Sequence, residues 1–211
     1  DYYNKPAAHE FLANEGETYL FLLSGENENT VGDYEFKLTE YEIPDNDSCE
    51  GAIEADSFPV IFKGSQLGAT PDFDELTIDT CGVNWYTRGV WYRLVGHGAV
   101  VRLDYQLYSK DVYGDSQLSV FTGSCDNLEC FTNIQGADYT AQWNMHKYNK
   151  PTASEFLAED GKSYWFLLTG ERFYTRANYE FKVTSYEIPD NDSCEDAIEA
   201  DSLTVIFKGS T

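Results

Sequence analysis

The sequence is poor in basic residues, and this shortage narrows the range of partners. Its 211 residues include 14 Lys and Arg against 37 Asp and Glu, which gives a formal net charge of −23. Nucleic acids and anionic membrane surfaces both require clustered positive charge, so neither is an expected partner. No apolar run approaches the roughly 20 residues of a transmembrane helix, and we expect no membrane insertion of this segment.

The sequence also lacks the residue patterns that support catalysis. Its three histidines are His9, His97 and His146, and they do not form a ligand-like or catalytic cluster. No G-x-S-x-G elbow, P-loop or HExxH motif occurs. Nucleophilic catalysis needs a base held beside the nucleophile, and no pair of residues suggests one. We therefore expect that the protein is not an enzyme.

What the sequence does contain is a long internal repeat. Residues 1–66 align with residues 146–211 without a gap, at an offset of 145, and 44 of these 66 pairs are identical. Residues 41–50 recur letter for letter as residues 186–195. Such a period indicates tandem structural units.

The repeat divides the chain into three expected parts. Residues 1–45 are the closing strands of a preceding repeat, residues 46–190 are one complete unit, and residues 191–211 are the opening strand of the following one. The chain starts at Asp1 without a signal-like segment and breaks off within a unit at both ends. This favours an excerpt from a tandem array over a two-domain protein with one degenerate copy.

Strand patterns dominate the complete unit. Apolar residues alternate with polar ones at 101–107 and at 179–184, which is the period of a half-buried strand. Runs rich in β-branched and aromatic residues indicate further strands at 58–63, 90–95, 118–122, 139–143 and 163–168. At most one helical turn is expected, at 49–55. Asp47 is its expected N-cap, and the side chain of Glu50, three residues on, is expected to bond back to the N-cap residue. The sequence thus predicts an all-β, antiparallel β-sandwich.

The N-terminal part is expected to repeat the closing strands. We expect strands at 6–12, 18–23 and 33–39. A set of strands that buries one face cannot form a sandwich alone. We therefore expect these strands to pair with strands supplied by a preceding stretch or a neighbouring subunit, with residues 202–207 as the matching piece at the far end.

The cysteines predict disulfides and an oxidising, extracellular setting. The complete unit holds Cys49, Cys81, Cys125 and Cys130, and Cys194 repeats Cys49, so its partner is expected beyond residue 211. Four cysteines allow three pairings. The short loop between Cys125 and Cys130 favours their pairing, which leaves Cys49 with Cys81. A zinc site would need CxxC or histidine spacing, and neither is present.

The boundary between units holds the candidate junction and glycosylation residues. Tyr41, Ile43 and Pro44, with their copies Tyr186, Ile188 and Pro189, are expected to form a stiff link packed against the next unit, because proline fixes φ and restricts the residue before it. Asn46 and Asn191 lie in the only N-x-[ST] sequons and are the expected glycosylation sites.

Two ligand hypotheses are weaker than their structural alternatives. Carboxylates at 72–79 and at Asp45, Asp47 and Glu50 suit calcium, but no regularly spaced calcium loop occurs, and such clusters are more often solvated surface. Trp85 and Tyr86 are the best exposed aromatic pair for stacking on sugars, whereas Trp91 and Tyr105 occupy strand positions typical of a core. No cofactor is otherwise expected.

An ordered set of short motifs resembles a known family. The matching stretches are Asn46 to Ile53, Cys81-Gly82, Gly89 to Gly96, Leu118 to Cys125 and Gly161 to Tyr164. Together they resemble secreted β-sandwich repeats that open with N-D-x-C-x-x-A-I, occur in tandem on surface proteins of bacteria and microalgae, and are similar to pre-peptidase C-terminal-like jelly rolls. The family often has a further cysteine before its closing strands, and residues 131–150 have none. The resemblance implies a jelly-roll or immunoglobulin-like fold and a cell-surface location, and it transfers no catalytic residue.

These observations predict a structural module. We expect units joined head to tail into an extracellular filament, stalk or coat, a disulfide-bonded acidic glycoprotein whose partners are neighbouring copies of the same repeat. The alternative is a glycan-binding or adhesion module displayed on a repetitive surface protein.

Overall fold

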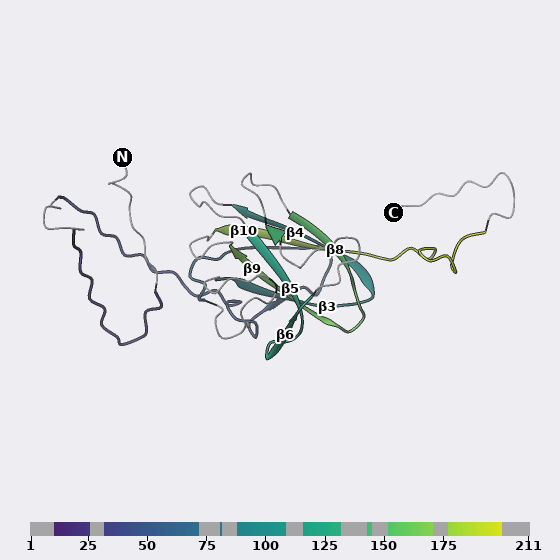
Figure 1. Ribbon diagram of the computed structural model, residues 1–211, viewed down its shortest axis with the longest axis horizontal. Coiled ribbons are helices and arrows are strands. Elements are labelled where there is room, and N and C mark those ends of the chain that lie inside the picture. The colour runs from purple at the N-terminus through teal and green to yellow at the C-terminus, as the bar shows by residue number, and fades with distance from the viewer. Residues whose placement is uncertain are drawn as a thin grey trace. The chain divides into compact units, whose positions relative to one another are not determined.

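The computed structural model describes residues 11–25, 32–71, 81, 88–108, 116–131, 143–144, 152–170 and 177–199. The chain divides into two compact units, Asp1–Glu40 and Tyr41–Thr211. All strands of the described residues lie in the second unit (Figure 1): β1 (Ile53–Glu54), β2 (Val60–Ser65), β3 (Val90–Val95), β4 (Ala99–Tyr108), β5 (Ser116–Ser124), β6 (Asn127–Cys130), β7 (Trp143–Asn144), β8 (Thr152–Ala158), β9 (Ser163–Gly170) and β10 (Asn178–Tyr186).

The strands form two sheets. One sheet has the order β1-β3-β9-β5-β6, with β7 also paired to β5, and the other has the order β2-β10-β4-β8. Every pair of strands is antiparallel except β1 and β3. The closing strands β8, β9 and β10 do not pair with one another, since β9 lies between β3 and β5 and β10 lies between β2 and β4. Each sheet therefore has one strand from the end of the unit inserted between strands from its beginning.

The period-two patterns predicted two of these strands correctly. In β4, Val101, Leu103 and Tyr105 are buried, while the intervening Arg102 and Asp104 are partly exposed. Phe181 of β10 lies opposite Tyr105 of β4 in the ladder. The strand expected at 139–143 falls mostly outside the described residues, and its end belongs to β7.

One hydrophobic core joins the two sheets. The ring of Tyr92 on β3 lies 5.3 Å from that of Phe181 on β10 and 4.5 Å from that of Phe62 on β2. The hydroxyl oxygens of Tyr92 and Tyr179 are 2.6 Å apart, so one phenol donates a hydrogen bond to the other inside the core. The described residues are therefore all-β, with two sheets packed on a shared aromatic core.

The disulfide pairing differs from the one expected. Cys49 bonds Cys125 and Cys81 bonds Cys130, so the predicted pairs Cys49–Cys81 and Cys125–Cys130 are wrong. The hairpin register is the reason. Cys130 lies opposite Phe121, whereas Cys125 lies in the turn beyond Ser124. Three strand residues separate the two positions by about 10 Å, beyond the reach of a disulfide.

The segment expected to form one helical turn is a turn without a helix. The Gly51 amide donates a hydrogen bond to the Ser48 carbonyl, and the Ala52 amide donates one to the Cys49 carbonyl, both at 3.1 Å. The Ser48 hydroxyl, instead of Asp47, accepts a side-chain bond from the Gly51 amide at 3.3 Å.

The first unit carries no strand in its described residues, 11–25 and 32–40, although strands were expected at 18–23 and 33–39. The strand expected at 6–12 and the matching piece at 202–207 lie almost wholly outside the described residues. A strand needs a ladder partner for its backbone groups. The counterparts of 18–23 and 33–39 find their partners only in early strands, which explains the difference.

Candidate functional site

The candidate site is the junction segment, residues 41–49, at the start of the second unit. Its Pro44 carbonyl accepts a hydrogen bond from the Asp47 amide at 3.0 Å, which closes a turn. The turn spans residues 44–47, and the four residues 46–49 are buried or partly buried against the body of the unit. The side chains of Asn46, Asp47 and Cys49 each make a defined contact there.

Asn46 is a buried polar residue of this segment. Its side chain is 4% exposed, and its amide nitrogen donates a 2.9 Å hydrogen bond to the Trp91 carbonyl. The Trp91 amide donates in return to the Asn46 carbonyl at 2.8 Å. Burial raises the pKa of Tyr179, while hydrogen bonds with Tyr92 and Asn46 act in the opposite direction. Asn46 thus links the junction to both β3 and the core phenols.

Asp47 fastens the junction segment to the loop after β2. Its two carboxylate oxygens accept from the Thr70 amide at 2.7 Å and from the Thr70 hydroxyl at 2.6 Å. Charge-assisted bonds of this length are among the stronger hydrogen bonds in proteins. Burial lowers the pKa of Arg88, and the charge of Asp47 opposes that shift. The carboxylate is therefore engaged inside the unit.

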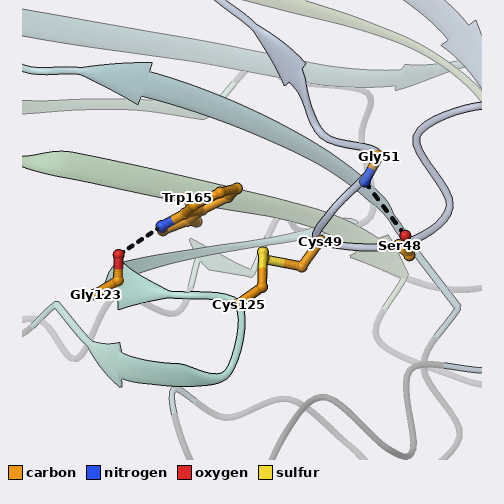
Figure 2. The surroundings of a disulfide bond; sticks show 6 residues. All are labelled: Ser48, Cys49, Gly51, Gly123, Cys125 and Trp165. Atoms are coloured by element: carbon orange, nitrogen blue, oxygen red, sulfur yellow. Dashed lines mark hydrogen bonds between the residues drawn. A yellow bond between two sulfur atoms is a disulfide. The ribbon is translucent and has the colours of Figure 1, made fainter.

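Cys49 adds a covalent attachment to the hairpin of β5 and β6. Figure 2 shows its bond to Cys125, with the turn of Ser48 and Gly51 on one side and Trp165 near the hairpin on the other. The two Cα atoms are 5.6 Å apart. The indole nitrogen of Trp165 donates to the Gly123 carbonyl at 3.0 Å and so holds the same hairpin against β9.

Gly68 permits close packing ahead of the turn. It has a φ of +86°, and a Cβ at this position would collide with the Glu42 carbonyl oxygen and lie 3.2 Å from Tyr41 Cβ. Only glycine combines this backbone conformation with so close an approach. The backbone of residues 41–42 is therefore held against the loop after β2.

The side chains of Tyr41 and Ile43 were expected to pack against the start of the unit, but they are exposed. Both are about half exposed, and their copies Tyr186 and Ile188 are exposed to a similar degree. Pro44 and Pro189 hold equivalent turns, since the Asp192 amide also donates to its proline carbonyl at 3.0 Å. The junction is anchored by the polar residues after the proline, and not by the apolar residues before it.

The second copy of the segment has the same local turn in a different environment. All described residues from 186 to 199 are exposed. The Asp196 amide donates to the Ser193 hydroxyl at 3.2 Å, as the Gly51 amide does to Ser48 at 3.3 Å. Cys194 is an exposed free thiol, and its expected partner beyond residue 211 stays a prediction. The turn is therefore formed locally, and the burial of residues 46–49 comes from the unit that receives them.

The two predicted glycosylation sites, Asn46 and Asn191, differ in their exposure to solvent. The burial of Asn46 and the bond from its amide to Trp91 speak against a glycan there, because a sugar on this nitrogen has no space in the folded unit. Asn191 is exposed, and its glycosylation stays a prediction.

The remaining ligand hypotheses find no site in the described residues. Trp85 and Tyr86, and the carboxylates at 72–79, lie outside them. Across the part of the chain that is described, no three His, Cys, Asp or Glu side chains group as metal ligands would. Within the same part, no helix is long and apolar enough to cross a membrane.

Sequence reasoning missed Thr70, the Trp91 backbone and Gly68 as junction residues. The repeat could not reveal Thr70 or Gly68, because the second copy ends at residue 211, which aligns with residue 66. The identity of residues 41–50 and 186–195 was the available signal, and it pointed to the segment but not to its partners.

Comparisons with known proteins add little to this geometry. No protein-family model matches the chain, and no curated protein matches it. Among solved structures, the Yersinia pseudotuberculosis-derived mitogen matches with 16% identity and a TM-score of 0.22, over 50% of this chain and 92% of that one. A likeness at this TM-score carries no argument about fold or function.

Proposed function

We propose that this chain is a structural module of an extracellular filament, stalk or coat, built from tandem β-sandwich units of 145 residues. Units are joined head to tail, and residues 41–49 and 186–194 are successive junctions. The two disulfides support an oxidising setting outside the cell. The high negative charge keeps a long polymer soluble.

The observation that carries the proposal is the attachment of residues 46–49, the end of the junction segment, to the body of the unit that they open. Asn46 bonds β3, Asp47 bonds Thr70, and Cys49 is covalently joined to Cys125. A linker fastened at three places cannot swing freely on that side. The residues that make these contacts recur at 191, 192 and 194, so a following unit has the same attachments available.

Rotary-shadowed electron micrographs of a polypeptide with three consecutive units test the proposal. We expect stiff rods with evenly spaced beads. Replacing Asp47 and its equivalents by Ala should broaden the distribution of angles between beads, while Asp160→Ala, an exposed turn residue, serves as the control. Freely jointed beads in the unsubstituted polypeptide would reject the filament function and favour a displayed glycan-binding or adhesion module.

A further inference from the structure

The first unit exposes a cluster of aromatic rings that we call the half-core: Phe11, Tyr19, Phe21 and Phe36. The ring of Phe11 lies 4.9 Å from that of Tyr19 and 6.0 Å from that of Phe21, and the ring of Phe21 lies 5.3 Å from that of Phe36. Large contiguous apolar surfaces of this kind usually bind something.

The half-core repeats the geometry of the finished core in the second unit. At an offset of 145, the counterpart of Phe11 and Tyr19 is the pair Phe156 and Tyr164, whose rings are 5.0 Å apart. The counterparts of the other two distances are 6.5 Å, from Phe156 to Phe166, and 5.7 Å, from Phe166 to Phe181. The closing segments therefore hold the same side-chain arrangement with and without a sheet.

A backbone contact repeats as well. The Asn14 amide donates to the Tyr19 hydroxyl at 2.8 Å, and the Glu159 amide donates to the Tyr164 hydroxyl at 3.0 Å. The turns beside them also match, with bonds of 3.2 Å from Glu17 N to the Asn14 carbonyl and from Lys162 N to the Glu159 carbonyl. The first unit is thus arranged like the closing part of a complete unit.

What differs between the two units is burial. Phe21 is 47% exposed whereas Phe166 is fully buried, and the same change separates a set of apolar pairs. The pairs are Phe11/Phe156, Tyr19/Tyr164, Phe21/Phe166, Leu22/Leu167, Leu23/Leu168, Tyr34/Tyr179, Phe36/Phe181 and Leu38/Val183.

The second unit shows what covers these rings. Phe131, directly after β6, lies 5.3 Å from both Phe156 and Tyr164. Tyr92 of β3 lies 5.3 Å from Phe181, and Phe62 of β2 lies 6.1 Å from it. These covering rings come from the early part of the unit, from β2 to the residue directly after β6.

The backbone leads to the same partner. The closing strands pair only with early strands: β9 with β3 and β5, β10 with β2 and β4, and β8 with β4. The described residues of the first unit form no strand, as expected of closing segments without their early partners. An added set of strands would satisfy their backbone groups, as in other β-strand complementation.

We propose that the half-core is a docking surface for strands β2 to β6 of a second copy of the repeat unit. The inference deepens the proposed function and rests on it for the statement that the partner is a neighbouring unit. Docking converts the exposed half-core into a finished core and makes the first unit the closing part of its neighbour. The junction segment that follows it then enters the next unit.

Leu12 supplies a matched control, because it is adjacent to Phe11 but belongs to the other face. Its counterpart Leu157 remains 37% exposed in the complete unit, whereas Phe156 is buried. A carboxylate at Leu12 should therefore stay in water after docking. A carboxylate at Phe21 would be buried without a partner.

The test uses the full 211-residue chain and a polypeptide of residues 46–145, refolded in oxidising buffer, as the probe. We expect a one-to-one complex by light scattering coupled to gel filtration, with a dissociation constant measured by titration calorimetry. Phe21→Asp should weaken binding about tenfold or more, because it buries a charge. Leu12→Asp should leave it unchanged. Both variants keep Phe166 and therefore an unchanged second unit. If only Phe21→Asp loses affinity for the probe, the probe binds the half-core of the first unit.

A second measurement covers the case in which the isolated probe does not fold. Residues 46–145 are joined ahead of residue 1 in one polypeptide, and hydrogen exchange is followed at the amides of residues 18–23. These amides should become as protected as those of residues 163–168. Absence of a complex together with unprotected amides, or equal binding by the Phe21→Asp variant, overturns the proposal. Protection of these amides, combined with freely jointed beads in the electron micrographs, would reject the filament function but leave the docking proposal standing.

Discussion

Asn46 and Trp91, 45 residues apart in the sequence, exchange two hydrogen bonds. The Asn46 side-chain amide donates to the Trp91 carbonyl at 2.9 Å, and the Trp91 backbone amide donates to the Asn46 carbonyl at 2.8 Å. Through this pair, the segment that enters the unit is joined to strand β3, which lies between β1 and β9. An asparagine that reads as a glycosylation acceptor in the sequence is a structural residue in the fold.

The first prediction concerns this asparagine. Asn46→Ala should lower the free energy of unfolding by about 1 kcal/mol, because it removes the buried hydrogen bond from the Asn46 side chain to the Trp91 carbonyl. Asn191→Ala is the matched control, since it changes the same residue of the same ten-residue stretch at an exposed position. Urea denaturation of the two variants measures the difference. Equal stabilities would contradict the structural role of Asn46.

The second prediction concerns the disulfides. Peptide mapping without reduction should find Cys49 linked to Cys125 and Cys81 linked to Cys130. The bonds close loops with sequence separations of 76 and 49 residues. On the chain-entropy model, loops of this size stabilise the fold by about 4 kcal/mol each. The double variant C49A/C125A should therefore melt well below the unsubstituted chain. Recovery of a Cys125–Cys130 peptide would show that the described hairpin register is incorrect.

A third prediction follows from the buried phenols. Burial raises the pKa of Tyr92, Tyr105 and Tyr179 above the ordinary tyrosine value. Below about pH 10 these phenols are protonated in both the folded and unfolded states, so their contribution to stability is fully present. Above that pH the unfolded chain releases protons that the folded chain retains, and the free energy of unfolding falls as pH rises.

Urea denaturation at a series of pH values from about 8 to 12 measures this decline. Tyr105→Phe should make it shallower, because it removes one of the contributing groups. Tyrosinate absorbance gives an independent check, since these phenols should ionise together with unfolding. A stability that stays constant up to pH 12 would count against their burial.

The fourth prediction concerns Gly68. Gly68→Ala should destabilise the unit by about 1–2 kcal/mol from its left-handed backbone alone, and further because the added Cβ collides with the Glu42 carbonyl oxygen. Gly98 is the control, since its φ is +73° and no atom lies within 4 Å of an added Cβ. Thermal unfolding of both alanine variants separates the collision from the backbone strain. If the two variants lose the same stability, residues 41–42 do not pack against Gly68.

The sequence alone was enough to predict several strands of the second unit and to single out the repeated segment that holds residues 41–49. Strand β4 could be predicted because burial of one sheet face imposes a period of two on its residues, and that period is local information. The anchoring stretch could be located because the chain repeats it without change, although its partners Thr70 and Trp91 lie far away in the sequence.

Only the tertiary structure decided the disulfide pairing and the burial of Asn46. Both depend on which strand ends meet, and the strand order brings the turn after β5 beside the segment that enters the unit. Loop length favoured Cys125 with Cys130, but antiparallel register holds those two positions apart. The closing strands β9 and β10 lie between early strands, and β8 pairs with the early strand β4, so that no closing strand pairs with another. This arrangement is set by long-range pairing that no local pattern of residues encodes.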